Sequence, residues 1–224
     1  YKVDSELAVG QMGEQAQPPG SALRKARRSW IEQQRPNHPV AEIPADGSIT
    51  PQLLSQALAE LIDDDCIVLA EAPSSTPAIL SALRPRQPQS FFTSGGSGLG
   101  WGINAAIGAK LACPNSTVIT LVGDGSYIFG VPSSVYWAAK RYDTPTLTVI
   151  YNNGGWNSPK RSHNLVHKEG GAAGASDQYW ITVNRESRLA DIAMAAGDAA
   201  SLQVTTSQQL SDVLREALQI VRSG

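Results

Sequence analysis

Two short polar segments carry oxygen atoms of the kind that bind a divalent metal ion. Gly123-Asp124-Gly125-Ser126 presents a carboxylate between two glycines, and Asn152-Asn153 presents carboxamide oxygens further along the chain. Mg²⁺ takes about six hard oxygen ligands and usually keeps phosphate oxygens and water among them. One carboxylate, one Asn oxygen and one backbone carbonyl would leave room for two phosphate oxygens and a water. The pattern therefore suggests a magnesium ion that holds a diphosphate.

Each polar segment directly follows an apolar run that is typical of a buried strand. These runs cover residues 117–122 and 146–151, and a helix is predicted between them at 133–141. A strand-helix-strand unit places its strands parallel, so that both carboxyl ends lie at one edge. Asp-Gly alone is commonly a turn, and Asn-Asn-Gly-Gly alone is commonly a loop with positive φ. Their succession at two neighbouring strand ends favours the metal site and predicts that the two oxygens converge.

Helices and strands alternate through most of the chain. We predict helices at 51–62, 74–83, 104–111, 133–141, 189–196 and 207–222, and strands at 66–70, 91–93, 117–122, 146–151 and 202–205. Thr50 is a suitable N-cap for the first of these helices, and Pro51 suits its first position. Residues 153–186 show no clear period. The alternation predicts an α/β fold with a parallel sheet that carries helices on both faces.

The first part of the chain has a different composition. Residues 1–44 are polar and rich in Pro and Gln, with one short helix expected at 21–33, which fits a linker or arm from a preceding domain. Residues 45–224 then form the diphosphate-binding domain. The chain begins with Tyr1 rather than Met, so we expect a piece of a longer subunit.

Composition argues against several classes of function. The 224 residues carry a formal net charge of −2, which gives no electrostatic case for nucleic acid, and we interpret the basic run at 24–28 as a solvated surface. No apolar stretch is long enough for a membrane span, no signal peptide is visible, and the two cysteines have no zinc-site spacing. We expect a cytoplasmic protein, and import into an organelle stays open.

The residues at the two strand ends resemble the thiamine-diphosphate motif. From about residue 49 to residue 221, the chain is similar to the diphosphate-binding domain of thiamine-diphosphate enzymes, in their acetolactate synthase and 2-oxo acid decarboxylase branch. The resemblance implies that Asp124, the Asn153 side chain and the Gly155 carbonyl hold Mg²⁺, and that Ser126 touches a phosphate. It also implies a cofactor site made of Ser74, Ser75, Ser97, Gly98, Leu99, Gly123, Asp124, Gly125, Ser126, Asn153, Gly155 and Trp156.

Two further segments have counterparts in that family. Ser74 and Ser75 follow the predicted strand at 66–70, where the family places small and hydroxyl residues on the diphosphate. The loop Ser97-Gly98-Leu99 resembles the one beneath the cofactor, in which a bulky aliphatic side chain bends the cofactor into a V. That residue would be Leu99, and the Ser97 carbonyl would accept a hydrogen bond from the 4′-amino group. Judged alone, the loop also fits a turn with a core leucine.

The resemblance implies an enzyme that decarboxylates 2-oxo acids or joins them to a second carbonyl, with the protein supplying binding and electrostatics. Family members need a Glu that activates the pyrimidine ring, supplied by a pyrimidine-binding domain of the same or a partner subunit. Glu71 does not fit that role, so the catalytic residue is expected outside this chain, which would be inactive alone. A homodimer or homotetramer is implied. Candidate contacts to the substrate follow the metal motif, at Trp156, Asn157, Lys160, Arg161, His163 and His167.

Two other functions stay open from the sequence. Gly100-x-Gly102-x-x-Ala105, with Asp124 about twenty positions later, fits a dinucleotide fingerprint and would indicate an NAD-type oxidoreductase domain. The strand before it is short and separated from the glycines, which weakens that interpretation. The third alternative is a non-catalytic interaction domain that keeps the same fold.

Overall fold

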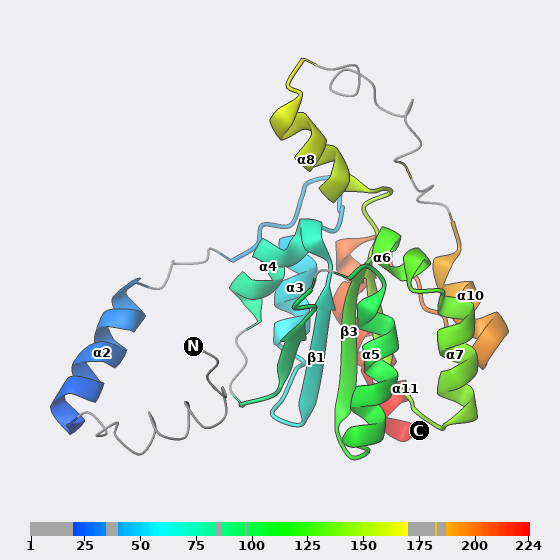
Figure 1. Ribbon diagram of the computed structural model, residues 1–224, viewed down its shortest axis with the longest axis horizontal. Helices are drawn as coiled ribbons and strands as arrows, with labels where there is room; N and C mark the ends of the chain where they lie inside the picture. Colours follow the sequence, from blue (N-terminus) through cyan, green and yellow to red (C-terminus); the bar gives the residue numbers. More distant parts are fainter. Residues whose placement is uncertain (1–19, 35–39, 84–86, 97, 170–181, 183–186) are drawn as a thin grey trace, which may run out of the picture. The chain divides into compact units, whose positions relative to one another are not determined.

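The computed structural model describes residues 20–34, 40–83, 87–96, 98–169, 182 and 187–224 (Figure 1). The chain divides into two compact units, Tyr1–Pro39 and Val40–Gly224. In the first unit, the described residues form one helix, α2 (Ser21–Gln34), which confirms the helix expected at 21–33. The side chain of Trp30 on this helix is largely exposed. Ser97, which the sequence assigned to the loop beneath the cofactor, lies outside the described residues.

The second unit alternates between helices and strands. Its elements are α3 (Pro51–Ala59), β1 (Cys66–Glu71), the 3₁₀ turn η1 (Pro73–Ser75), α4 (Thr76–Ala82), β2 (Phe91–Thr93), α5 (Trp101–Ala112), β3 (Thr117–Gly123), α6 (Asp124–Phe129), α7 (Pro132–Arg141), β4 (Leu147–Tyr151), α8 (Asn157–Val166), α10 (Leu189–Gly197) and α11 (Ser207–Ser223). This order confirms the predicted α/β class.

The described strands form one parallel sheet in the order β2-β1-β3-β4. In the register, Glu71 of β1 lies beside Val122 of β3, and Gly123 of β3 lies beside Tyr151 of β4. The ends of β1, β3 and β4 are therefore level, at what we call the carboxyl edge of the sheet. Figure 1 shows α8 standing beyond this edge. In parallel sheets, ligands bind outside the carboxyl ends of the strands.

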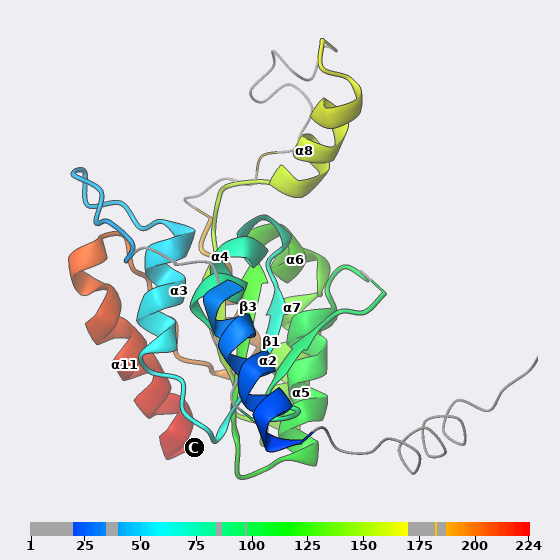
Figure 2. The same ribbon diagram turned by 90° about the vertical axis from the view of Figure 1, so that its left-hand side faces the viewer.

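Helices cover both faces of the sheet, as predicted. On one face, Leu58 of α3 and Leu210 and Leu214 of α11 pack with Ile119 and Leu121 of β3. On the other face, Val122 of β3 packs with side chains from α5, α6, α7 and α10 in a second buried cluster, which contains Ile103, Tyr127, Val135, Tyr136, Leu189 and Ala193. Figure 2 shows α3 and α11 on one side of the strands and α5 and α7 on the other. None of the described helices is long and apolar enough to cross a bilayer.

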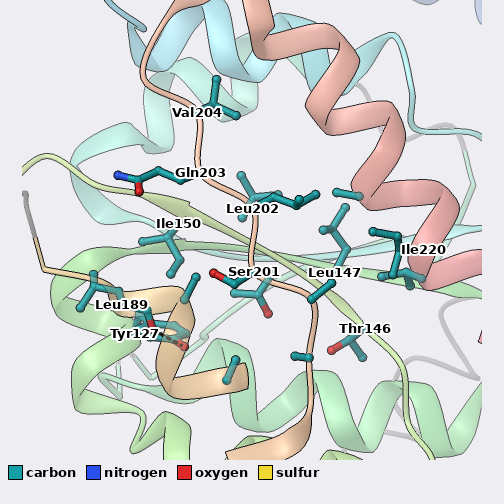
Figure 3. Close-up of a pocket in the computed structure, with 18 of the residues that line it drawn as sticks. Tyr127, Thr146, Leu147, Ile150, Leu189, Ser201, Leu202, Gln203, Val204 and Ile220 are labelled. Atoms are coloured by element: carbon teal, nitrogen blue, oxygen red, sulfur yellow. Dashed lines mark hydrogen bonds between the residues drawn. The ribbon is translucent and has the colours of Figure 1, made fainter. Parts of the chain in front are cut away.

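The predicted strand at 202–205 is wrong, since these residues form no strand in the structure. Val204 packs against the core cluster that includes Leu147 and Tyr151 of β4, and both segments line a cavity of about 790 Å³. Figure 3 shows Leu202, Gln203 and Val204 along this cavity, with Leu147 and Ile150 of β4 also lining it. An apolar run becomes a strand only when a neighbouring backbone satisfies its N–H and C=O groups. Here the contact with β4 is made by side chains, and residues 202–205 form no ladder with it.

A helix is present where the sequence showed no period. α8 (Asn157–Val166) has no buried residues, so it lacks the apolar stripe by which a helix is recognised in a sequence. The start of α4 also differs, because Ser74 and Ser75 form the 3₁₀ turn η1 before the α-helix begins at Thr76. Both differences lie at the carboxyl edge.

The predicted cap of α3 is confirmed and can be tested. The Thr50 hydroxyl accepts a hydrogen bond from the backbone N–H of Leu53 at 3.2 Å, with Pro51 at the first helical position. Thr50→Ala should lower the free energy of unfolding by about 1 kcal/mol, because the N–H of Leu53 at the helix start loses its partner. Urea denaturation followed by circular dichroism would measure this loss.

Thr206→Ala is the matched control for this experiment. Thr206 is the N-cap residue of α11, but its side chain makes no capping hydrogen bond. The control should lose clearly less stability than Thr50→Ala. Equal losses in the two variants would contradict the assignment of Thr50 as the working cap.

Candidate functional site

The Asp124 carboxylate lies at the end of β3 and is almost fully buried, with 2% of its surface exposed. Its Oδ1 accepts a hydrogen bond from the backbone N–H of Gly125 at 2.9 Å. Its Oδ2 accepts two more, each 2.9 Å long, from the N–H groups of Gly154 and Gly155. The carboxylate at the end of one strand therefore holds the loop that follows the next strand.

The Asn153 side chain lies at the same point. Its Oδ1 accepts a hydrogen bond of 3.1 Å from the N–H of Gly155, the group that also donates to Asp124 Oδ2. A shared donor means that the two oxygens are no further apart than these two bonds allow. The parallel register of β3 and β4 has thus brought a carboxylate oxygen and a carboxamide oxygen together, as the sequence predicted.

Burial raises the pKa of Asp124. The hydrogen bonds that it accepts from three backbone N–H groups oppose this rise. Within the described part of the chain, no basic side chain donates a hydrogen bond to this carboxylate or forms an ion pair with it. A buried carboxylate is costly without compensation, and a cation at this point would favour its ionised form. The electrostatics of the site therefore suit a bound cation.

The oxygens available here match the ligand set of Mg²⁺ rather than that of a transition metal. Within the described ranges, no group of three or more His, Cys, Asp or Glu side chains could hold a metal ion. A site with one carboxylate therefore depends on amide, carbonyl and phosphate oxygens. The buried Gly155 carbonyl accepts a hydrogen bond from the N–H of Asn157 at 2.9 Å. A carbonyl oxygen has two lone pairs, so this bond leaves one for a metal.

Hydroxyl groups lie on both sides of Asp124 along the carboxyl edge. Ser126 is buried in the first turn of α6, directly after the carboxylate. Ser75 is buried and Ser74 is half-buried in η1, which follows β1, the neighbour of β3 in the sheet. The three serines thus lie on the segments that directly follow two neighbouring strands, β1 and β3.

The indole ring of Trp156 packs directly against the backbone of Gly125. A Cβ atom on Gly125 would lie 2.7 Å from Cε3 and 2.9 Å from Cζ3 of the indole. Gly123, on the other side of Asp124, has no such neighbour, because the nearest atoms to its Cβ position are 3.9 and 4.0 Å away. The need for glycine after Asp124 is therefore steric, and it comes from the residue that follows Gly155.

The loop before α5 presents its side chains at the protein surface. Leu99 is 40% exposed, and Gly98 is exposed with no atom within 4 Å of its Cβ position. Leu99 is therefore not the core leucine that the loop alone would also fit. Gly100, which follows it, is buried and has a φ of +84°, a conformation that glycine adopts without strain.

The start of α5 speaks against a dinucleotide site. In a dinucleotide fold, the backbone N–H groups at this helix start would bind the pyrophosphate. Here Glu71, at the end of β1, accepts hydrogen bonds from the N–H of Gly100 at 2.6 Å and of Gly102 at 2.5 Å. A protein carboxylate already occupies the place of the phosphate. The glycine fingerprint is therefore explained by this contact rather than by NAD.

Several residues that support the site were not predicted from the sequence. Glu71 was weighed only as an activating acid, and Asn104 had no predicted role, although its Nδ2 donates to the carbonyls of Gly100 and Gly130. The hydroxyls of Tyr151 and Ser55 lie 3.0 Å apart, a contact that was also not predicted and that anchors the end of β4 to α3. Glu71 offered one signal in the sequence, because it is a charged residue at the end of an apolar strand.

The geometry agrees with comparisons with known proteins. Residues 74–223 match the family model described as thiamine pyrophosphate enzyme, C-terminal TPP binding domain. The chain is 32% identical over 133 residues to benzoylformate decarboxylase from Pseudomonas aeruginosa, covering 55% of this chain and 25% of that protein. It is 33% identical over 111 residues to the large subunit of acetolactate synthase isozyme 2 from Escherichia coli K12, covering 49% and 20%.

A solved structure shows the same similarity. The thiamine diphosphate-dependent 4-hydroxybenzoylformate decarboxylase from Rhodococcus jostii RHA1 superimposes with a TM-score of 0.70 and 25% identity, over 82% of this chain and 33% of that one. The chain thus spans between about a fifth and a third of the length of these relatives. The family match, the parallel sheet and the carboxyl edge lead to one conclusion: this chain belongs to the thiamine pyrophosphate enzymes, as a C-terminal cofactor-binding domain of the decarboxylase and acetolactate synthase type.

Proposed function

We propose that this chain holds the diphosphate of thiamine diphosphate through Mg²⁺, within an enzyme that decarboxylates or ligates 2-oxo acids. The observation that carries the proposal is the meeting of Asp124 Oδ2 and Asn153 Oδ1 at the N–H of Gly155. These oxygens and the Gly155 carbonyl are the proposed metal ligands. They come from the ends of adjacent parallel strands, which is the geometry that a diphosphate bridged by a metal requires.

The other site residues are assigned by their place along the carboxyl edge. Ser74, Ser75 and Ser126 are proposed to contact the diphosphate, with Gly123 and Gly125 allowing its close approach. Ser97, Gly98 and Leu99 are proposed to lie beneath the rings, and Trp156 to close the site beside Gly125. The bound cofactor supplies the nucleophile and the electron sink. The residues of this chain bind it, orient it and exclude water.

The substrate class is a 2-oxo acid, as the name of the related benzoylformate decarboxylase indicates for that enzyme. The carboxylate of such a substrate calls for a positive group near the site. α8 follows the metal segment and carries Lys160, Arg161 and His163, and it stands beyond the carboxyl edge (Figure 1). We propose that this helix contributes to substrate selection, together with Trp156 and Asn157 at its start and His167 at its end.

A second domain is proposed to complete the active site. The described residues include no carboxylate placed to activate the pyrimidine ring, since Glu71 is engaged by Gly100 and Gly102. We propose that a pyrimidine-binding domain, of the same or a partner subunit, supplies this Glu in a homodimer or homotetramer. Residues 1–44 would then connect the two domains. Both cysteines, Cys66 and Cys113, are free thiols, which fits a cytoplasmic enzyme and leaves organellar import open.

Metal-dependent cofactor binding is the first test. In the natural full-length protein, Asp124→Ala and Asn153→Ala should each weaken binding of thiamine diphosphate at least about 100-fold in the presence of Mg²⁺, because a ligand to the metal is lost. Titration calorimetry with and without EDTA would measure this change. Wild-type protein should lose binding when EDTA removes the metal.

Asn152→Ala is the matched control, because it changes the same residue type one position earlier. The Asn152 Oδ1 also shares a donor with Asp124, the N–H of Gly154, but Asn152 is exposed whereas Asn153 is half-buried. The control variant should weaken binding by less than about tenfold. Unchanged affinity in Asp124→Ala, or equal losses at the two asparagines, would remove these residues from the metal site.

The packing of Trp156 on Gly125 gives a second test. Gly125→Ala should lower the free energy of unfolding by about 1–3 kcal/mol, since its Cβ would overlap the indole and the site has no free space. Gly123→Ala should cost clearly less, because its Cβ would meet only ordinary contacts. Thermal unfolding of the cofactor-free protein would compare them. Equal stabilities of the two variants would show that the indole does not lie on Gly125.

Activity on 2-oxo acids is the third test. With Mg²⁺ and thiamine diphosphate, the full-length protein should release CO₂ from benzoylformate or from pyruvate, and measurement of both rates would place it nearer one group of relatives. Formation of acetolactate from pyruvate would identify a carboligase. Cofactor binding without CO₂ release from either compound would favour the non-catalytic alternative or a different 2-oxo acid, which a wider panel of 2-oxo acids would decide.

A further inference from the structure

Glu71 is a buried carboxylate that the proposed chemistry does not use. It ends β1 at the carboxyl edge, with 7% of its surface exposed. Burying a charged group is costly unless it is fully hydrogen-bonded, so its position calls for an explanation. The contacts of its two oxygens supply one.

The two carboxylate oxygens are divided between two backbone N–H groups of one loop. Oε1 accepts from Gly100 at 2.6 Å and Oε2 accepts from Gly102 at 2.5 Å. Both bonds lie at the start of α5, where the helix dipole favours a negative charge. A Cβ on Gly102 would lie 3.1 Å from Oε2, so the approach is close. Glu71 therefore fixes the backbone of this turn.

Other contacts complete the fixation of Gly100. Its carbonyl accepts from Asn104 Nδ2 at 2.8 Å, and a Cβ on Gly100 would lie 2.7 Å from the Cα of Gly130. The peptide groups around Gly100 are thus held from β1, from α5 and from the junction of α6 and α7. The side chain of Leu99, directly before Gly100, is left 40% exposed. The fixed backbone at Gly100 is thus followed back along the chain by a partly exposed apolar side chain, that of Leu99.

Glu71 also belongs to the segment proposed to hold the diphosphate. It lies three residues before Ser74 and four before Ser75, and its register with Val122 places it level with the strand that delivers Asp124. One side chain therefore ties the diphosphate end of the site to the loop proposed to lie beneath the rings. The separation of these two parts must match the length and bend of the cofactor.

We propose that Glu71 is a positioning residue of the cofactor site. Its carboxylate sets the place of Leu99 relative to Ser74 and Ser75, and so determines how the bound cofactor is bent. This inference rests on the proposed function. Glutamine cannot replace the carboxylate, because its amide group offers one acceptor oxygen and would turn its NH₂ group toward the second N–H.

The test compares variants of the full-length protein for cofactor affinity and turnover. Glu71→Gln should retain Mg²⁺-dependent binding of thiamine diphosphate within about tenfold, because the metal ligands are unchanged. At saturating cofactor, kcat on the accepted 2-oxo acid should fall about 10–100-fold, since a misplacement near 1 Å costs that much. The near-ultraviolet circular dichroism of the bound cofactor should also change. Glu216→Gln removes an exposed charge from α11 and is the control, with kcat unchanged.

A double-mutant cycle separates positioning from general loss of stability. If Glu71 acts through Leu99, then Glu71→Gln combined with Leu99→Ala should have a kcat within about threefold of Leu99→Ala alone. If the double variant instead lowers kcat by the product of the two single effects, the inference is overturned. Glu71→Asp keeps the charge at α5 but withdraws it by one methylene. It should fold and still lose turnover, so a wild-type kcat in this variant would also overturn the inference.

The outcomes distinguish this inference from the function on which it rests. If the wild-type protein binds no thiamine diphosphate with Mg²⁺, the proposed function fails, and the inference fails with it. If the wild-type protein binds the cofactor and turns over substrate while Glu71→Gln keeps its kcat, only the inference fails.

Discussion

This site depends on one interaction: a buried carboxylate accepts hydrogen bonds from backbone N–H groups. Asp124 is 2% exposed, and its oxygens accept from Gly125, Gly154 and Gly155. A buried charge is tolerated only when its hydrogen bonds are made, so the loop after β4 must keep its shape for the carboxylate to stay in place. The loop and the carboxylate therefore stabilise each other. Asn153 is part of that loop, and its position follows from the same bonds.

The same arrangement occurs one strand away. Glu71 ends β1 and accepts from Gly100 and Gly102, as Asp124 follows β3 and accepts from Gly154 and Gly155. In each case, a carboxylate at a strand end holds a glycine-containing loop that belongs to another part of the chain. The two carboxylates differ in what they leave available. Glu71 is engaged by an α-helix start, whereas Asp124 lies beside a second side-chain oxygen, that of Asn153. This difference explains why one is assigned to the metal and the other to positioning.

The rest of the fold keeps these strand ends level. β3 is buried along its length between α3 and α11 on one face and α5, α6, α7 and α10 on the other. Close packing on both faces leaves the strands little freedom to slide, and a slip by one residue would turn each side chain to the opposite face. Tyr151 adds a hydrogen bond to Ser55 at the end of β4. The cavity beside β4 adjoins this site, because Ser75 and Asn153 are among its lining residues, although Asp124 is not.

The sequence by itself determined the fold class, most of the helices and strands, and the meeting of Asp124 with Asn153. It did so because these follow from local rules: hydrophobic period, the cap at Thr50, and the fixed direction of parallel strands. Only the tertiary structure decided that residues 202–205 do not join the sheet beside β4, and that Trp156 covers Gly125. It alone gave Glu71 a role, since a hydrogen bond between residues about thirty positions apart leaves no periodic signal in the chain. Such contacts depend on how separate elements pack, and packing is a property of the whole molecule.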